Sequence, residues 1–391
     1  MSTNIAETTI NEVADIRSDV HEKIQLVRES VTRLRPYVPG KPIDEVKREL
    51  GLPADMPIVK LASNENVLGP SPAAVAAMQR VLEEVWLYPD DLCFDLKNKL
   101  AQFWNVTPEH LIVGNGSDEI IHFLSLALLD PNRGDEVIFA EPSFVQYKAA
   151  AMMADCPFVA VPLTPDMRHD LRAMKAQVNA RTKLIFIANP NNPTGTVVSR
   201  AEFEELLDGL PKHVVVVLDQ AYLEYVETDD SPNGLDYIAN HNVVVLQTFS
   251  KAYALAGLRV GYGIARPELT AYLQQVRGPF NVNMVAQAAA IASLDDKAQI
   301  TRAQETNAAG KQQLYSAFDE LDLRYVPSEA NFVLVDCGRD AKQIEYSLLK
   351  QGVIVRTGFG LPTHLRVTVG TREMNERFIS SLREVLALRS D

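Results

Sequence analysis

Short runs of apolar, mostly β-branched residues recur between residues 111 and 265, and segments with the apolar spacing of helices separate them. Almost every position in these runs is apolar, which predicts strands buried on both faces of a mostly parallel seven-stranded sheet, with helices on both faces. The last two runs are too close for a crossover helix, so we expect the seventh strand to run antiparallel. The runs are 111–115, 136–140, 158–163, 183–189, 214–219, 243–249 and 260–265.

The pattern changes after residue 281, where a long helical stretch is followed by three further apolar runs and a final helical segment. This order predicts a second, smaller α+β domain. We expect the large α/β domain to cover residues 67–280, and the small domain to combine residues 36–66 with residues 281–391. The three further runs are 331–336, 353–358 and 365–370.

Residues 1–35 are predicted to form a helical extension. Apolar residues recur at steps of three and four from Val13 to Leu34, which places them on one face of a helix that Pro36 would end. This apolar stripe could pack on the protein's own body or on a second subunit, because its spacing is also typical of paired helices.

Composition excludes several kinds of partner. The 391 residues carry a formal net charge of −13, which argues against nucleic acid but allows a local basic pocket for one phosphate. The three cysteines are far apart and fit neither a zinc site nor a disulfide framework, so we expect a reducing, cytoplasmic environment. No stretch approaches the ~18 apolar residues of a membrane span, and the polar N-terminus lacks a signal peptide's apolar core, so no membrane contact is expected.

Polar residues follow several of the predicted strands, where an open parallel sheet binds its ligands. After the first strand the chain reads GSDE (116–119) and begins a helix, so free amides and a hydroxyl could bind an anion; an ordinary helix cap explains the same residues. After the fourth strand, PNNPTG (190–195) predicts a rigid turn that could direct asparagine amides into a cleft.

A carboxylate and an amine follow two further strands. Asp219 ends the fifth predicted strand, with Tyr222 three residues later, and Lys251 follows the sixth, with Arg259 eight positions on. A metal is not expected, because no histidine or second acid lies at ligand spacing. Lys251 alone could be an ordinary solvated lysine. Together, however, an acid, a lysine and an anion-binding cup suit a phosphorylated cofactor with a ring nitrogen and an aldehyde, as pyridoxal phosphate sites require.

The chain resembles the fold-type-I pyridoxal-phosphate-dependent aminotransferases and, among them, the histidinol-phosphate aminotransferases. The resemblance covers roughly residues 35–385. It implies that the large domain binds pyridoxal 5′-phosphate. The segments that carry it are RPYVPGKPIDEVKRELG (35–51), KLASNENVLGPSP (60–72), YPD (88–90), GNGSDE (114–119), NPNNPTG (189–195), DQAY (219–222), TFSKAYALAGLRVGY (248–262) and LRVTVGT (365–371).

The resemblance implies a role for each matching residue. Lys251 would bind the cofactor covalently and move a proton, and Asp219 would keep the cofactor's ring nitrogen protonated. Tyr222 and Asn192 would donate to its phenolate oxygen. Phe144, where many members carry a tyrosine, would stack on its ring. The residues around the cofactor phosphate would be Gly116, Ser117, Asp118, Thr248, Ser250 and Arg259.

Further positions would bind the substrate or the second subunit. Arg366 would bind the α-carboxylate of the amino donor through two hydrogen bonds, and Asn64 would also line the substrate site. Tyr37 and Arg356 would lie near the distal group of the substrate, where a phosphate ester is expected. Tyr88 would reach the phosphate held by the neighbouring subunit, which implies a homodimer.

The implied activity is transamination between L-histidinol phosphate and 2-oxoglutarate in histidine biosynthesis. Two alternatives with the same cofactor stay open. The enzyme could act on aromatic amino acids, or it could decarboxylate an amino-acid phosphate. A nicotinamide-dependent dehydrogenase is not expected, because no G-x-G-x-x-G turn follows an early strand.

Overall fold

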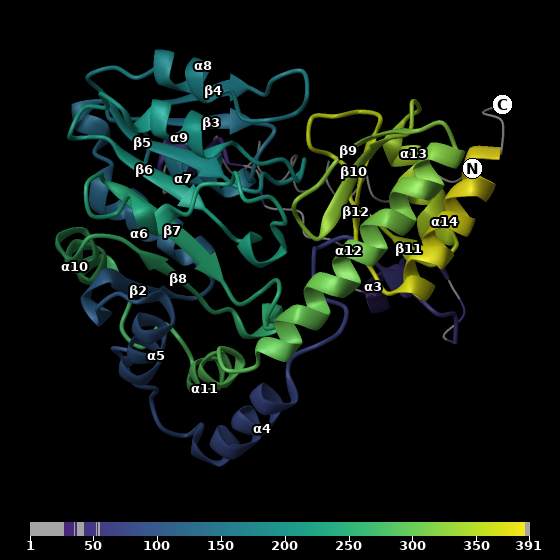
Figure 1. Cartoon of the computed structure of the whole chain (residues 1–391), viewed down its shortest axis with the longest axis horizontal. Coiled ribbons are helices and arrows are strands. Elements are labelled where there is room, and N and C mark those ends of the chain that lie inside the picture. Colours follow the sequence, from purple (N-terminus) through teal and green to yellow (C-terminus); the bar gives the residue numbers. More distant parts are fainter. Residues whose placement is uncertain (1–26, 35, 37–42, 52, 54, 388–391) are drawn as a thin grey trace.

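The computed structural model describes residues 27–34, 36, 43–51, 53 and 55–387. Its largest element is a seven-stranded sheet with the order β2-β8-β7-β6-β5-β3-β4 (Figure 1). Strand β8 runs antiparallel to both neighbours, and the other pairs are parallel, which confirms the predicted fold class. The strands are β2 (Leu111–Gly114), β3 (Glu136–Glu141), β4 (Phe158–Pro162), β5 (Thr182–Ala188), β6 (Val215–Asp219), β7 (Val243–Thr248) and β8 (Gly261–Ile264).

The apolar runs form central strands because both of their faces are buried. In β6, Val216 and Leu218 belong to one apolar core and Val215 and Val217 to another, since successive side chains point to opposite faces of a sheet. On the first face lie α4 (Pro72–Val81), α5 (Phe94–Trp104), α8 (Leu171–Ala176), α9 (Arg200–Leu207) and α11 (Met284–Ser293). On the other lie α6 (Ser117–Leu128), α7 (Val145–Met153) and α10 (Pro267–Val276).

A smaller α+β layer has its own apolar core, which contains Phe318, Val335 and Phe378. Its antiparallel sheet has the order β12-β10-β9, and β1 pairs in parallel with β11. The strands are β1 (Val59–Lys60), β9 (Arg324–Val326), β10 (Phe332–Asp336), β11 (Val353–Ile354) and β12 (His364–Thr368). The helices are α3 (Ile43–Leu50), α12 (Lys297–Glu320), α13 (Ala341–Lys350) and α14 (Arg372–Ala387).

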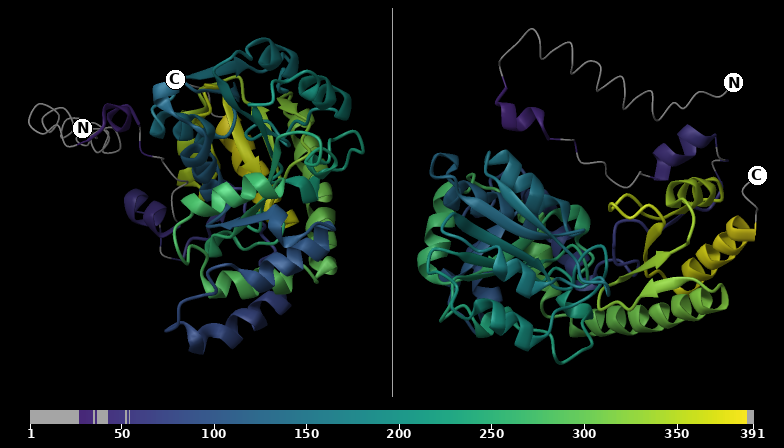
Figure 2. Two further views of the ribbon diagram at one scale, coloured as in Figure 1. Left: turned by 90° about the vertical axis from the view of Figure 1, so that its left-hand side faces the viewer. Right: turned by 90° about the horizontal axis from the view of Figure 1, so that it is seen from above.

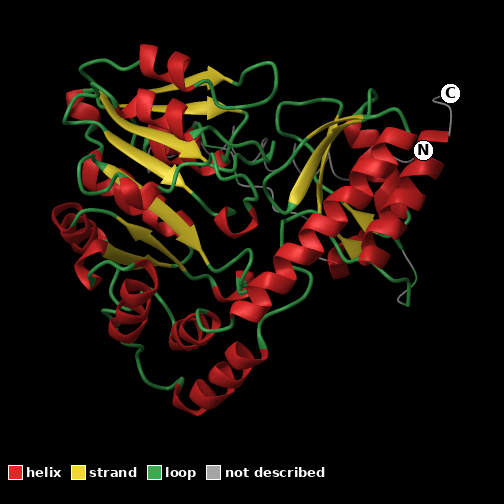
Figure 3. Ribbon diagram, viewed as in Figure 1, coloured by secondary structure: helices red, strands yellow, loops and turns green. Residues whose placement is uncertain are grey.

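The carboxyl ends of the parallel strands face the smaller layer. The arrowheads of β3, β4, β6 and β7 point toward it, and α12 reaches from beside α11 into it (Figure 3). Helix α11 itself packs against α4 and α5 in the core of the large sheet. Helix α11 comes after residue 281 and yet packs in the core of the large sheet, so the domain boundary near residue 281 stays a prediction. The sheet edge that carries the candidate chemistry lies between the two layers.

Only residues 27–34 of the predicted N-terminal helix lie within the described part of the chain, and the apolar positions from Val13 to Ile24 lie outside it. The short helix α2 (Glu29–Thr32) lies beside α7 (Figure 2). Arg28 donates to the Met153 carbonyl at 3.2 Å, and Arg33 pairs with Asp155 at 2.7 Å. In the described ranges, no helix combines the length and apolar character needed to cross a membrane.

Candidate active site

The strand order brings the predicted site residues to one edge of the large sheet. Strands β6 and β7 are parallel neighbours with Asp219 opposite Leu246, so the chain segments that follow both strands emerge on the same side. Lys251 comes three residues after the end of β7. Ligands of open parallel sheets bind beyond the carboxyl ends of the strands, and this edge is such a place.

An anion-binding cup forms where α6 begins. Gly116 precedes α6 with a φ of +76°, and a Cβ added there would lie 2.5 Å from Nη2 of Arg259. Arg259 donates to the Ser250 hydroxyl at 3.3 Å and pairs with the half-exposed Asp118 at 3.4 Å. The Ser250 amide donates to Thr248 Oγ1 at 3.1 Å. The positive φ favours glycine at 116, and any larger residue would also displace the Arg259 guanidinium. The cup presents amides, hydroxyls and a guanidinium, the donors that a phosphate needs.

Asp219 is a buried carboxylate, 5% exposed, whose two hydrogen-bond donors are neutral. Tyr147 donates its hydroxyl to Oδ2 at 2.8 Å, and the Ala221 amide donates to Oδ1 at 3.2 Å. Burial raises the pKa of Asp219 to about 6, and the Tyr147 hydroxyl opposes that rise. Because neither donor carries a charge, Asp219 suits a ligand that presents a cationic N–H group.

Tyr147 is a site residue that the sequence interpretation missed. Its ring stacks on Phe186 at 4.6 Å between centroids and meets Phe144 edge-on at 5.6 Å. Burial raises the pKa of Tyr147 well above its usual range, so the hydroxyl stays a donor to Asp219. The signal in the sequence is its position three residues, about one helical turn, after Phe144.

Lys251, Tyr222 and Asn64 lie together across the edge. The Lys251 amine donates to the Ser63 carbonyl at 3.3 Å and lies 5.6 Å from the centroid of the Tyr222 ring. The Tyr222 hydroxyl accepts from the Asn64 amide at 2.9 Å. The three predicted catalytic residues, Lys251, Asp219 and Tyr222, thus occupy one region, since Lys251 also acts electrostatically on Asp219.

Arg366 forms the opposite wall of the site. It is 6% exposed and donates to Asn192 Oδ1 at 2.5 Å and to the Ala62 carbonyl at 2.6 Å. Its guanidinium also lies 5.3 Å from the centroid of Phe332. Arg356 pairs with Arg366 through backbone hydrogen bonds of 3.1 and 2.8 Å. These contacts hold the guanidinium rigidly, as recognition of a carboxylate requires.

The two asparagines of the PNNPTG turn have different partners. Asn191 is fully buried, accepts from the Ser143 hydroxyl at 2.7 Å and donates to Thr194 at 3.0 Å. These bonds make the turn rigid. Asn192 contacts Arg366 instead, so it is the asparagine of this turn that takes part in the site.

The described contacts do not bring two of the predicted site residues, Tyr88 and Tyr37, to the site. Tyr88 is 80% exposed and stacks on Phe280 with 4.5 Å between ring centroids. Tyr37 lies outside the described residues. Whether these two residues contribute to the site is therefore still a prediction.

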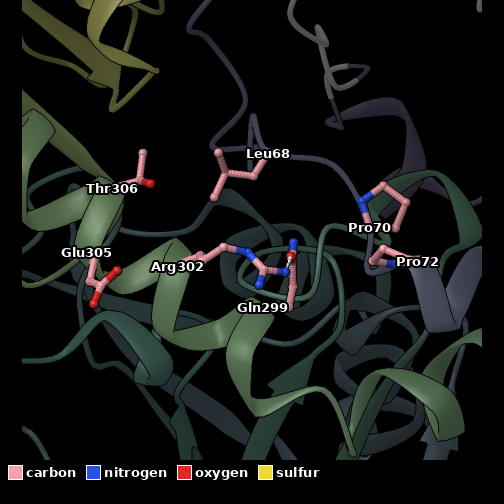
Figure 4. Close-up of a pocket in the computed structure, with 7 residues that line it drawn as sticks. All are labelled: Leu68, Pro70, Pro72, Gln299, Arg302, Glu305 and Thr306. Carbon is pink, nitrogen blue, oxygen red and sulfur yellow. Dashed lines mark hydrogen bonds between the residues drawn. The ribbon is translucent and has the colours of Figure 1, made fainter.

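A cavity of about 360 Å³ lies between the start of α4, with the segment before it, and helix α12 (Figure 4). None of the predicted site residues within the described part of the chain lines it. Within the described residues, no group of three or more His, Cys, Asp and Glu side chains is arranged to hold a metal ion. The lining residues of the cavity are Leu68, Pro70, Pro72, Gln299, Arg302, Glu305 and Thr306.

Known proteins are similar to this chain in sequence and in fold. The family described as "Aminotransferase class I and II" matches residues 56–382. Histidinol-phosphate aminotransferase of Moorella thermoacetica is 51% identical, covering 92% of this chain and 93% of the relative. Histidinol-phosphate aminotransferase 2 of Carboxydothermus hydrogenoformans is 46% identical, covering 93% and 100%. The solved structure of histidinol-phosphate aminotransferase from Sinorhizobium meliloti in complex with pyridoxal-5′-phosphate has a TM-score of 0.85 and 27% identity, covering 94% and 99%.

Proposed function

This chain belongs to the class I and II aminotransferase family, and from that premise we propose that it transfers an amino group between L-histidinol phosphate and 2-oxoglutarate. The products are imidazole-acetol phosphate and L-glutamate, in histidine biosynthesis. The observation that carries the proposal is the identity of 51% and 46% to histidinol-phosphate aminotransferases, over 92% and 93% of this chain. A cytoplasmic location is part of the proposal and is supported by the composition and the free cysteines.

The residues at the sheet edge fit pyridoxal 5′-phosphate. When bound, the cofactor supplies a ring that takes up the electron pair left when the substrate's α-carbon loses its proton. Ser117, Ser250 and Arg259 would bind the phosphate, and Gly116 leaves the space that Arg259 occupies. Asp219 would pair with the ring nitrogen, which is the N–H partner that its neutral surroundings call for.

Other residues of the chain would orient the ring and move the proton. Phe144 would cover one face of the ring. Tyr222 and Asn192 would donate to the phenolate oxygen, and Asn192 can do so because Arg366 engages its Oδ1, leaving the NH₂ group turned the other way. Lys251 would hold the cofactor and then accept the proton from the substrate's α-carbon at Nζ.

The substrate would lie between Lys251 and Arg366. Arg366 would bind the α-carboxylate of L-glutamate, because its guanidinium is already oriented by Asn192 and Ala62. Arg356 would act on the distal phosphate of histidinol phosphate, from the chain segment that pairs with Arg366. The phosphate ester then distinguishes this substrate from an aromatic amino acid.

The active assembly would be a homodimer. Large apolar side chains are exposed together on residues 82–94 and at Phe280, and patches of this kind mark contact surfaces. A second copy would cover them and bring Tyr88 to the neighbouring phosphate. Trp86→Glu should shift the assembly toward monomer in sedimentation experiments. The exposed residues are Leu82, Val85, Trp86, Leu87, Tyr88, Leu92, Phe94 and Phe280.

Steady-state kinetics on the purified protein with added cofactor test the function. With 2-oxoglutarate as acceptor, we expect kcat/KM for L-histidinol phosphate to exceed that for phenylalanine or tyrosine by at least about 100-fold, since charged groups matched to a substrate reject analogues that lack its charge. Equal turnover of the aromatic amino acids would favour the aromatic alternative. Carbon dioxide released from an amino-acid phosphate would favour the decarboxylase.

A substitution of Arg356 tests the assigned role. Arg356→Leu should lower kcat/KM for histidinol phosphate much more than for phenylalanine, because only the former carries a phosphate. Arg172→Leu, at an exposed arginine paired with Glu205, is the matched control and should change neither value. Equal losses for both substrates in Arg356→Leu would contradict the role.

A further inference from the structure

Three consecutive residues after β1 each contact a different member of the site. The Ala62 carbonyl accepts from Arg366 at 2.6 Å, and the Ser63 carbonyl accepts from Lys251 at 3.3 Å. The Asn64 amide donates to the Tyr222 hydroxyl at 2.9 Å. Arg366 belongs to the small sheet, whereas Lys251 and Tyr222 follow strands of the large one. This segment therefore connects the substrate side of the site to its cofactor side.

Asn64 is held in an unusual conformation by residues outside the site. Its φ of +58° lies in the left-handed region, and the residue is 1% exposed. Thr368 Oγ1 accepts from the Asn64 backbone amide at 2.9 Å and donates to its Oδ1 at 3.1 Å. Asn331 donates to the Asn64 carbonyl at 3.0 Å. The Thr368 hydroxyl thus fixes the oxygen end of the Asn64 side chain, which leaves the NH₂ end toward Tyr222.

We propose that Thr368 is a positioning residue: its hydroxyl orients the Asn64 amide, and that amide strengthens the Tyr222 hydroxyl as a donor to the cofactor. A hydroxyl whose oxygen accepts a hydrogen bond becomes a better donor, because bonds in a chain polarise one another. A stronger donor to a phenolate oxygen favours the deprotonated form of the group. This inference rests on the proposed function only through the bound cofactor, and the identity of the substrate does not enter it.

Strand β12 adds a geometric reason. Arg366 and Thr368 are two residues apart in β12, so their side chains share one face of the strand. The strand therefore delivers both the substrate-binding guanidinium and the orienting hydroxyl to the site. Thr368 itself contacts Asn64 rather than any group assigned to cofactor or substrate.

The test is a pH titration of the visible absorbance of the holoenzyme. Thr368→Val removes the hydroxyl and keeps the branched shape, and we expect the midpoint of the absorbance change to rise by about 0.3 to 1 pH unit, the range of one lost hydrogen bond. Thr368→Ser, which keeps the hydroxyl, should stay within about 0.1 unit of the parent protein. Thr270→Val is the matched control, since Thr270 is a buried hydroxyl that donates to the Glu109 carbonyl instead.

The substitution leaves in place the charged and titratable groups around Tyr222 and Lys251. A second comparison shows whether the effect passes through Tyr222: in a Tyr222→Phe background, Thr368→Val should produce no further shift. If Thr368→Val does not fold, Asn64→Asp should raise the midpoint, because it replaces the donating amide by an acceptor. The groups left in place are Asp118, Tyr147, Asp219, Glu224, Tyr225 and Arg366.

The outcomes separate this inference from the proposed function. An unchanged midpoint in Thr368→Val, a shift of equal size in Thr270→Val, or the same shift in the Tyr222→Phe background would each overturn it. A holoenzyme that prefers aromatic amino acids would contradict the proposed substrate and leave the midpoint test valid. A protein that binds no pyridoxal phosphate would refute the proposed function itself.

Discussion

Replacing Tyr147 by phenylalanine removes one hydroxyl from the partners of Asp219 and leaves the aromatic packing in place. The phenylalanine ring can still stack on Phe186, as Tyr147 does at 4.6 Å. Only the hydrogen bond of 2.8 Å to Asp219 Oδ2 is lost. Because that bond stabilises the carboxylate, its loss raises the pKa of Asp219 further above its ordinary value.

The size of the effect follows from the burial of Asp219. Burial already raises the pKa of Asp219 to about 6 in the protein without cofactor. A hydrogen bond to a charged group contributes about 1.5 to 3 kcal/mol, or roughly one to two pKa units. At pH 7 the ionised fraction of Asp219 would then fall from about 90% to between about 50% and 10%. The cofactor's ring nitrogen requires the ionised form, so binding at pH 7 should weaken by about two- to ten-fold.

Cofactor titrations between pH 6 and pH 9, followed by quenching of intrinsic fluorescence, measure this directly. We expect the fold-difference in affinity between Tyr147→Phe and the parent protein to be largest at pH 6 and to shrink as the pH rises, because both proteins then carry an ionised Asp219. Tyr237→Phe removes a hydroxyl that donates to Glu204 at 3.1 Å and is the matched control. A loss of affinity that is constant across this pH range would refute the reasoning, because ionisation of Asp219 could not be its cause.

Two further changes test the anion-binding cup and the binding of the substrate carboxylate by Arg366. Gly116→Ala should lower the free energy of unfolding by about 1 to 3 kcal/mol, because a φ of +76° strains alanine. It should also weaken cofactor binding, because the new Cβ would displace the Arg259 guanidinium, whose Nη2 lies 2.5 Å away. Gly209→Ala is the matched control, since Gly209 has a φ of +67° and open space around its Cβ. It should lower the free energy of unfolding in urea by a similar amount and leave the cofactor affinity unchanged. Equal cofactor affinities for the two variants would count against the cup. Arg366→Lys should raise KM for L-glutamate at least about ten-fold, since lysine cannot form two parallel hydrogen bonds. An unaltered KM in steady-state assays would exclude carboxylate binding by Arg366.

The strands of the large sheet were readable from sequence because burial on both faces requires consecutive apolar residues. All seven predicted runs are strands, and β8 is antiparallel as expected. The smaller layer was less accessible. The run at 353–358 contains only the two-residue strand β11, and Arg356 joins Arg366 through an isolated bridge. Strand β9 was missed because its three residues are exposed or half-buried and carry no apolar pattern.

The order of residues along the chain determines that a lysine, a carboxylate and a glycine-rich turn each follow a strand. Parallel strands bring such positions to one edge, so Lys251, Asp219 and Gly116 could be assigned to one site before any coordinates were considered. The partners of these residues could not be assigned in this way. Tyr147 meets Asp219 across 72 residues and Thr368 meets Asn64 across 304, and only the packed arrangement of both layers brings them within hydrogen-bonding distance. Local patterns reflect backbone periodicity and burial. A hydrogen bond instead requires its donor and acceptor to be placed to within a few tenths of an ångström, and tertiary packing alone sets those positions.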